Sequence, residues 1–159
     1  WQQHRIARLV VQKLFGTVTG KRLAILGFAF KADTNDTREA PAIRICQDLL
    51  EEGAQLVIHD PKVAPDQIAR DLQQESASQV DALSGSGSWA RANSVEDAVM
   101  GADAVLVLTE WQHYRDLNWQ ALAARMRKPA WVFDARAVAD PAQIKAAGLS
   151  LWRVGDGEG

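Results

Sequence analysis

The chain has 159 residues, of which 47% are hydrophobic and 24% charged, and its formal net charge at pH 7 is −2. This composition is typical of one globular domain, and the near balance of charge gives no general attraction to nucleic acid or to anionic membranes. The single cysteine, Cys46, excludes an internal disulfide bond and favours a reducing compartment. The apolar runs are too short to span a bilayer. We therefore expect a soluble cytoplasmic domain with no nucleic-acid or membrane partner.

The first predicted element is a helix that ends near Gly16, a residue type that commonly terminates helices. Four apolar side chains fall on one face of it: Ile6, Leu9, Val10 and Leu14. The chain opens without a methionine and already in helical phase. This start suggests a piece of a longer protein.

Strands and helices then alternate. Residues 22–26, RLAIL, are apolar after Arg22, as in a parallel strand buried on both faces. Residues 41–53 predict a helix with Pro41 in its first turn and Gly53 at its end. The later predicted elements are strands at 54–60, 103–109, 129–135 and 149–155, and helices at 94–102, 118–126 and 141–148.

This alternation predicts an α/β fold: a Rossmann-like, doubly wound, mainly parallel sheet with helices on both faces. We expect the strands at 22–26 and 103–109 to be neighbours in its centre, because both are continuously apolar. Residues 73–88, rich in Gly, Ser and Gln, are predicted to form a mobile surface loop.

Ligands of doubly wound sheets bind beyond the carboxyl ends of the strands. Two of these ends carry a cation, namely Lys31 after the first strand and Arg136 after the strand at 129–135. With the N-terminus of the helix at Pro41, these cations would neutralise a diphosphate, and Phe28 or Phe30 would offer a flat apolar surface beside it.

The loop after the first strand differs from an ordinary NAD site. The G-x-G-x-x-G pattern needs its second glycine so that the backbone can approach a pyrophosphate. Here Gly27 is followed by Ala29 and Ala32 at the other two glycine positions. A phosphate would therefore be met by side chains. Asp60 ends the second strand, where an acid often binds a ribose, but Asp-Pro is also a common turn.

The segment KRLAILGFAFKADTNDTREAPAI, followed in order by HDPKV, LTEW and FDAR, resembles the C-terminal domain of the UDP-glucose 6-dehydrogenases. The resemblance implies an N-terminal NAD-binding domain, a long central helix and a C-terminal Rossmann-like domain that binds the UDP part of the substrate. Residues 1–16 would then be the end of the central helix, and residues 17–159 the UDP-sugar-binding domain.

The resemblance also implies residue roles. Phe30 and Lys31 would hold the nucleotide sugar, Arg136 would contact it from a further strand, and Arg38 would reach the NAD bound mainly by the other domain. The whole enzyme would be a homodimer that oxidises UDP-glucose to UDP-glucuronate with two NAD. The alternatives are a UDP-N-acetylhexosamine or GDP-mannose dehydrogenase domain, or a stand-alone nucleotide-binding module without catalysis.

In the family, oxidation passes through a thiohemiacetal and a thioester on a cysteine in a Gly-rich segment ahead of the central helix. The sequence contains no such segment, and Cys46 lies on a predicted helix among apolar residues, where a thiol is inert. We expect this chain to bind UDP or a UDP-sugar but to catalyse no oxidation, and we assign it no catalytic or metal-binding residue.

Each proposed site residue also has a simpler interpretation. Lys31 could pair with Asp33 or Asp36, Arg38 with Asp36, and Arg136 with Asp134. One departure from the family concerns the start of the helix, where Ala40 stands at a position at which relatives often have a capping serine. This change is expected to lower the stability of the helix by about 1 kcal/mol.

Overall fold

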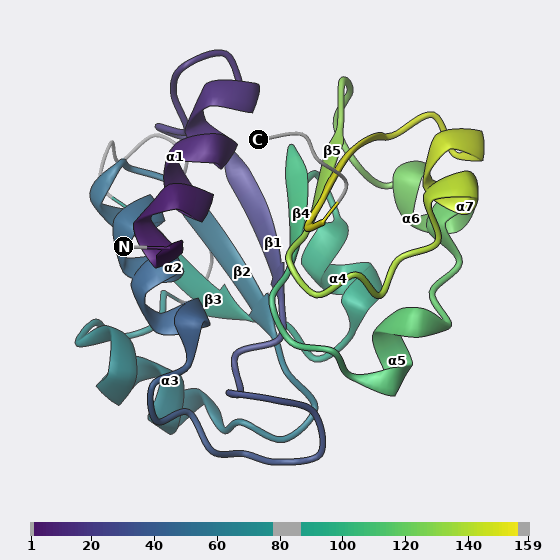
Figure 1. Cartoon of the computed structure of the whole chain (residues 1–159). Helices are drawn as coiled ribbons and strands as arrows, with labels where there is room; N and C mark the ends of the chain where they lie inside the picture. Colours follow the sequence, from purple (N-terminus) through teal and green to yellow (C-terminus); the bar gives the residue numbers. More distant parts are fainter. Residues whose placement is uncertain (1, 78–86, 156–159) are drawn as a thin grey trace.

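The computed structural model describes residues 2–77 and 87–155 (Figure 1). Within these residues six strands form one parallel sheet in the order β3-β2-β1-β4-β5-β6. The strands are β1 Arg22–Leu26, β2 Gln55–His59, β3 Ser88–Arg91, β4 Ala104–Val107, β5 Trp131–Asp134 and β6 Ser150–Arg153. The helices are α1 Gln2–Lys13, α2 Pro41–Glu51, α3 Pro65–Leu72, α4 Val95–Val99, α5 Gln112–Arg115, α6 Trp119–Ala123 and α7 Pro141–Ala146.

The predicted fold class is confirmed, and so is the pairing of the two central strands. β1 lies beside β4 with Leu23 opposite Ala104. From Leu23 to Leu26 and along all of β4 the side chains are buried. Continuous burial follows from helices that cover both faces of the sheet, so no strand residue in the centre turns to water.

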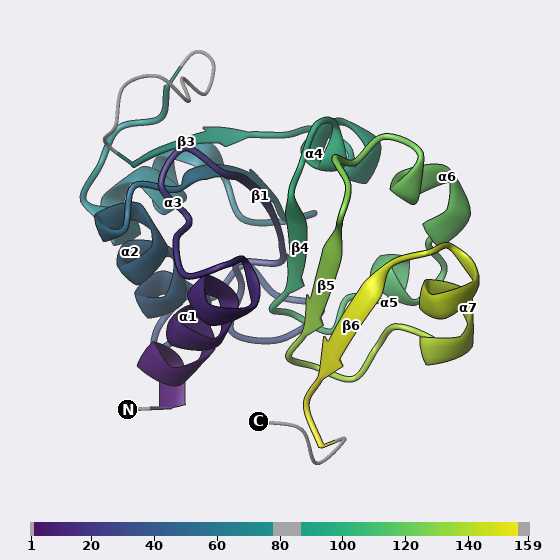
Figure 2. The same ribbon diagram turned by 90° about the horizontal axis from the view of Figure 1, so that it is seen from above.

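Figure 2 shows how the helices divide between the two faces. α1 packs against α2 on one side, while α4, α6 and α7 lie on the other. α2 begins at Pro41, as predicted, and its N-cap residue Ala40 makes no side-chain capping bond. None of the described helices is long and apolar enough to cross a membrane.

Three short elements were not predicted. β3 has only one buried residue, Trp89, among its four, so its pattern gives no apolar run. α3 and α5 are one- to two-turn helices, too short for a clear 3.6-residue period.

The predicted loop at 73–88 is wrong at its end, because Ser88 opens β3. Two hydrogen bonds join the first part of the predicted loop to β3. Ala77 donates its backbone N–H to the carbonyl of Trp89 at 2.8 Å, and the Trp89 indole donates to the carbonyl of Gln74. Residues 78–86, on which the predicted mobility depends, lie outside the described part of the chain.

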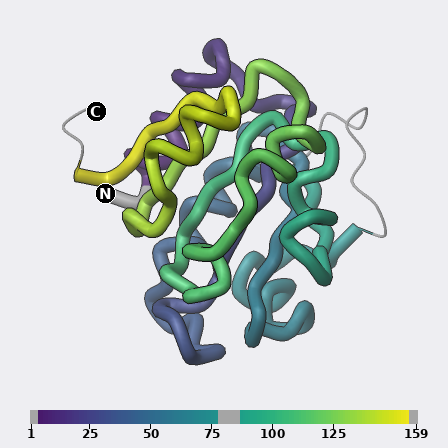
Figure 3. Tube along the Cα trace, turned by 90° about the vertical axis from the view of Figure 1, so that its right-hand side faces the viewer, coloured from purple at the N-terminus to yellow at the C-terminus, as the bar shows by residue number. Residues whose placement is uncertain are grey.

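The strand order reverses at β1, because the chain leaves β3 at one edge and returns as β4 on the other side of β1. The carboxyl ends of the strands lie at the lower end of the molecule in Figures 1 and 3, together with residues 27–40. A doubly wound sheet binds ligands at such a point.

Candidate functional site

The site is built around the turn that leaves β1. Gly27 has φ +100°, and a Cβ at this position would lie 2.4 Å from Cβ of Thr109. The Thr109 hydroxyl donates to the carbonyl of Ala29 at 2.8 Å. The glycine therefore allows the loop of residues 27–40 that follows β1 (the β1 loop) to lie directly against Thr109, the second residue after β4.

Asp60 fixes this loop from the end of β2. Its side chain is fully buried. Its two carboxylate oxygens accept five hydrogen bonds, from the backbone N–H groups of Phe28, Ala29, Lys62 and Val63 and from the indole N–H of Trp111. Both carboxylate oxygens are taken up by these donors, so Asp60 is not available to bind a ribose. Of the two roles considered from the sequence, the structure shows that of a turn-forming residue.

Arg136 reaches the same loop from the end of β5. Its guanidinium donates to the carbonyl oxygens of Leu108 at 3.0 Å and Phe30 at 3.1 Å. It also pairs with Glu110 at 3.0 Å, and both side chains are about one-quarter exposed, at 27% and 28%. The alternative pair with Asp134 is wrong for the guanidinium, because the only Arg136 group that donates to Asp134 within the described residues is the backbone N–H.

Phe30 and Lys31 form the exposed tip of the loop. Phe30 is 43% exposed, whereas Phe28 is buried and offers no surface to a ligand. Lys31 is exposed, and within the described residues it makes no ion pair with Asp33 or Asp36, although its charge adds a small contribution to the effect of Arg38 on the pKa of Asp36. The structure thus places the guanidinium of Arg136 against the backbone of the loop tip that carries Phe30 and Lys31.

Arg38 has the simpler partner that the sequence suggested. Its guanidinium donates to both carboxylate oxygens of Asp36, at 3.1 and 2.9 Å, and is itself 89% exposed. These hydrogen bonds lower the pKa of Asp36 to about 2. The ion pair with Asp36 is confirmed; the contact of Arg38 with NAD stays a prediction.

Cys46 lies fully buried on α2. Burial raises the pKa of its thiol far above the ordinary value. The predicted burial of Cys46 among apolar residues is confirmed, and the raised pKa disfavours the reactive thiolate near neutral pH.

Sequence reasoning missed the roles of Glu110, which contacts the β1 loop, and of Tyr114, which contacts His59 at the end of β2. Glu110 accepts the N–H of Ala32 at 2.7 Å in addition to its pair with Arg136. Tyr114 lies 2.9 Å from Nδ1 of His59 and donates to the His59 carbonyl. The position of Glu110 at the end of β4 was visible in the sequence, but the bonds it makes were not.

Burial, with a smaller contribution from nearby His113, lowers the pKa of His59 to about 4. The unfolded chain, with a pKa near 6.5, then binds more protons than the folded chain between these values, so stability falls as pH falls. We expect a loss of about 1–2 kcal/mol from His59 between about pH 7 and about pH 4.5, after allowance for solvent screening. Urea unfolding of wild type and His59→Gln at both pH values measures it; an equal pH dependence in the two proteins would contradict the assignment.

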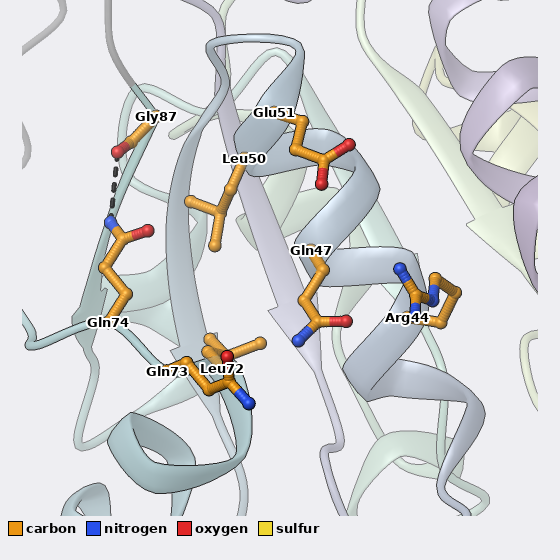
Figure 4. A pocket seen from close by; sticks show the side chains of 8 residues that line it. All are labelled: Arg44, Gln47, Leu50, Glu51, Leu72, Gln73, Gln74 and Gly87. Atoms are coloured by element: carbon orange, nitrogen blue, oxygen red, sulfur yellow. Dashed lines mark hydrogen bonds between the residues drawn. The ribbon is translucent and has the colours of Figure 1, made fainter.

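A separate cavity of about 590 Å³ lies between α2, the end of α3 and the start of β3 (Figure 4). Its lining is largely polar, and Gln74 closes one side by donating to the carbonyl of Gly87. The lining includes Leu50 and Glu51 from the end of α2, away from the carboxyl ends of the strands. None of the four predicted site residues lines it.

Known proteins resemble this chain closely. A UDP-glucose 6-dehydrogenase of Oryza sativa subsp. japonica is 39% identical over 166 residues, which cover 98% of this chain and 34% of that protein. The enzyme of the same name from Drosophila melanogaster is 39% identical over 155 residues, with 98% and 32% covered. The chain spans about a third of the length of these relatives.

Solved structures share the fold. The NDP-N-acetyl-D-galactosaminuronic acid dehydrogenase from Methanosarcina mazei Go1 superposes with a TM-score of 0.72 at 22% identity, covering 96% of this chain and 28% of that one. A UDP-glucose dehydrogenase from Pyrobaculum islandicum gives 0.67 at 23% identity, with 96% and 29% covered. Residues 24–141 match the UDP binding domain of the UDP-glucose/GDP-mannose dehydrogenase family, and the chain belongs to that family.

Proposed function

We propose that this chain is the UDP-sugar-binding part of an NAD-dependent UDP-glucose 6-dehydrogenase, a homodimer that oxidises UDP-glucose to UDP-glucuronate. The family match and the similarity to UDP-glucose 6-dehydrogenases support the proposal. The observation that carries it is the exposed Lys31, without an ion pair in the described residues, in a loop tip whose Phe30 carbonyl accepts a hydrogen bond from Arg136, at the point where the strand order reverses. An anionic ligand there meets two cations.

Lys31 and Arg136 would bind the diphosphate in different ways. Lys31 offers a mobile ammonium group with three donors. Arg136 has five N–H donors, of which at least three are directed to protein acceptors, so only outward-facing ones remain for a phosphate oxygen. The half-exposed ring of Phe30 would cover an apolar face of the nucleotide.

The residues present do not fit NAD at the β1 turn. The turn lacks the glycine pattern, and the N–H groups of Phe28 and Ala29 already donate to Asp60. We assign Arg38 as the contribution of this chain to NAD binding. Its pair with Asp36 is exposed to water, where an ion pair contributes little stability, so a cofactor phosphate can replace the carboxylate. The rest of the NAD site and the catalytic cysteine belong to the whole enzyme.

Lys31→Ala is expected to weaken UDP binding by about 1.5–3 kcal/mol, roughly a 10- to 150-fold higher Kd, because a charge-assisted hydrogen bond is lost. Arg38→Ala is the matched control: it removes the same charge from the same exposed loop but should leave UDP binding nearly unchanged. Calorimetric titration of wild type and both variants with UDP measures the difference. Absence of UDP binding by wild type would overturn the proposed function, and equal losses in the two variants would overturn the division of roles.

A further inference from the structure

Four backbone N–H groups at the start of the β1 loop already donate to acceptors within the protein. Oδ2 of Asp60 accepts those of Phe28 and Ala29, at 2.8 and 3.0 Å. The N–H of Phe30 donates to the carbonyl of Asp36 at 2.7 Å, and that of Ala32 to Glu110 at 2.7 Å. In a glycine-rich dinucleotide turn, such groups are left for the pyrophosphate of the ligand.

Asp60 therefore serves as an internal anion. It is fully buried, and a buried carboxylate is tolerated only when its oxygens are well hydrogen-bonded. A ligand phosphate bound to the same N–H groups would have to displace this carboxylate and lie against its charge. Recognition of a diphosphate at this loop is left to side chains.

The five donors to Asp60 come from three places in the fold. They belong to the loop after β1, to the turn before α3, and to Trp111, which precedes α5 and is 6% exposed. The carboxylate thus ties together the segments that follow β1, β2 and β4. The residues that it holds directly precede Phe30 and Lys31.

We propose that Asp60 is a positioning residue of the nucleotide site: its buried carboxylate fixes the β1 loop so that Lys31 meets the diphosphate of the ligand. This inference rests on the proposed function. Asp60 acts through the loop and does not touch the nucleotide. Its effect on binding is therefore expected to depend on Lys31.

A double-mutant cycle tests that dependence. Asp60→Asn keeps the shape of the side chain but replaces one acceptor oxygen by an amide donor, which faces N–H donors. We expect this change to raise the Kd for UDP about tenfold. In the Lys31→Ala background Asp60→Asn should raise the Kd less than about threefold further, against about tenfold in the wild-type background. Fully additive effects would overturn the proposal, because a residue that only stabilises the fold shows no coupling to Lys31.

Amide hydrogen exchange gives a second test that needs no ligand. Asp60→Asn should speed exchange at Phe28 and Ala29 while the amides of β1 keep their protection. Unchanged exchange at Phe28 and Ala29 would overturn the positioning role of Asp60, whether or not wild type binds UDP. Absence of UDP binding by wild type would by itself refute only the proposed function. If Asp60→Asn does not fold, Trp111→Phe removes one of the five donors and should shift exchange and Kd in the same directions by smaller amounts. No shift in either quantity would again overturn the proposal.

Discussion

Gly27→Ala is expected to lower the free energy of unfolding by about 2–6 kcal/mol, the sum of backbone strain and overpacking of about 1–3 kcal/mol each. The glycine has φ +100°, where a Cβ is strained. The added methyl group would also lie 2.4 Å from Cβ and 2.7 Å from the backbone N of Thr109. The backbone of Thr109 follows a fully buried central strand and cannot move aside. Domains of this kind are stable by only about 5–15 kcal/mol, so the loss is a large fraction of the total.

Urea unfolding compares this variant with Gly148→Ala. Gly148 has φ +79°, but a Cβ there meets nothing within 4 Å. The control therefore carries the backbone penalty alone, about 1–2 kcal/mol. Equal destabilisation by the two substitutions would show that the approach of the β1 loop to Thr109 is not as close as described.

Arg136→Ala is expected to have two effects. It should weaken UDP binding by about 1.5–3 kcal/mol, as charge-assisted hydrogen bonds do. It should also lower the free energy of unfolding by about 1–3 kcal/mol, because the carbonyls of Leu108 and Phe30 lose a donor and Glu110 loses its counter-ion. Lys31→Ala, by contrast, should leave stability unchanged, since Lys31 makes no ion pair within the described residues.

Arg127→Ala is the matched control for Arg136. It removes the same side chain from a 70% exposed position, whose partner Asp103 lies 3.7 Å away at the start of β4. We expect neither UDP binding nor stability to change by more than about 1 kcal/mol. Arg136→Lys should recover part of the UDP affinity through its charge but little of the stability, because an ammonium cannot reproduce the planar fork. If Arg136→Ala weakened UDP binding without loss of stability, the contacts of Arg136 with the loop would be energetically unimportant.

The sequence alone determined that the sheet is parallel, that β1 and β4 are its central neighbours, and that the β1 loop follows the first strand. Continuous apolar runs at residues 22–26 and 103–109 require burial on both faces, and only the middle of a helix-covered sheet provides it. Pro41 likewise predicted where α2 begins. The apolar neighbours of Cys46 predicted its burial and the raised pKa of its thiol. Burial and helix starts depend on residues close together in the chain, so local patterns report them.

Only the tertiary structure decided the partners of the charged side chains. Asp134 is two residues from Arg136, yet the guanidinium pairs with Glu110, 26 residues away. The strand order places β4 beside β5, so the residues that follow these two strands meet at one edge of the sheet. Likewise, Asp60 meets Phe28 and Trp111 because β1 lies between β2 and β4. An ion pair or a buried carboxylate depends on which strands are neighbours in space, and no periodicity in the sequence carries that information.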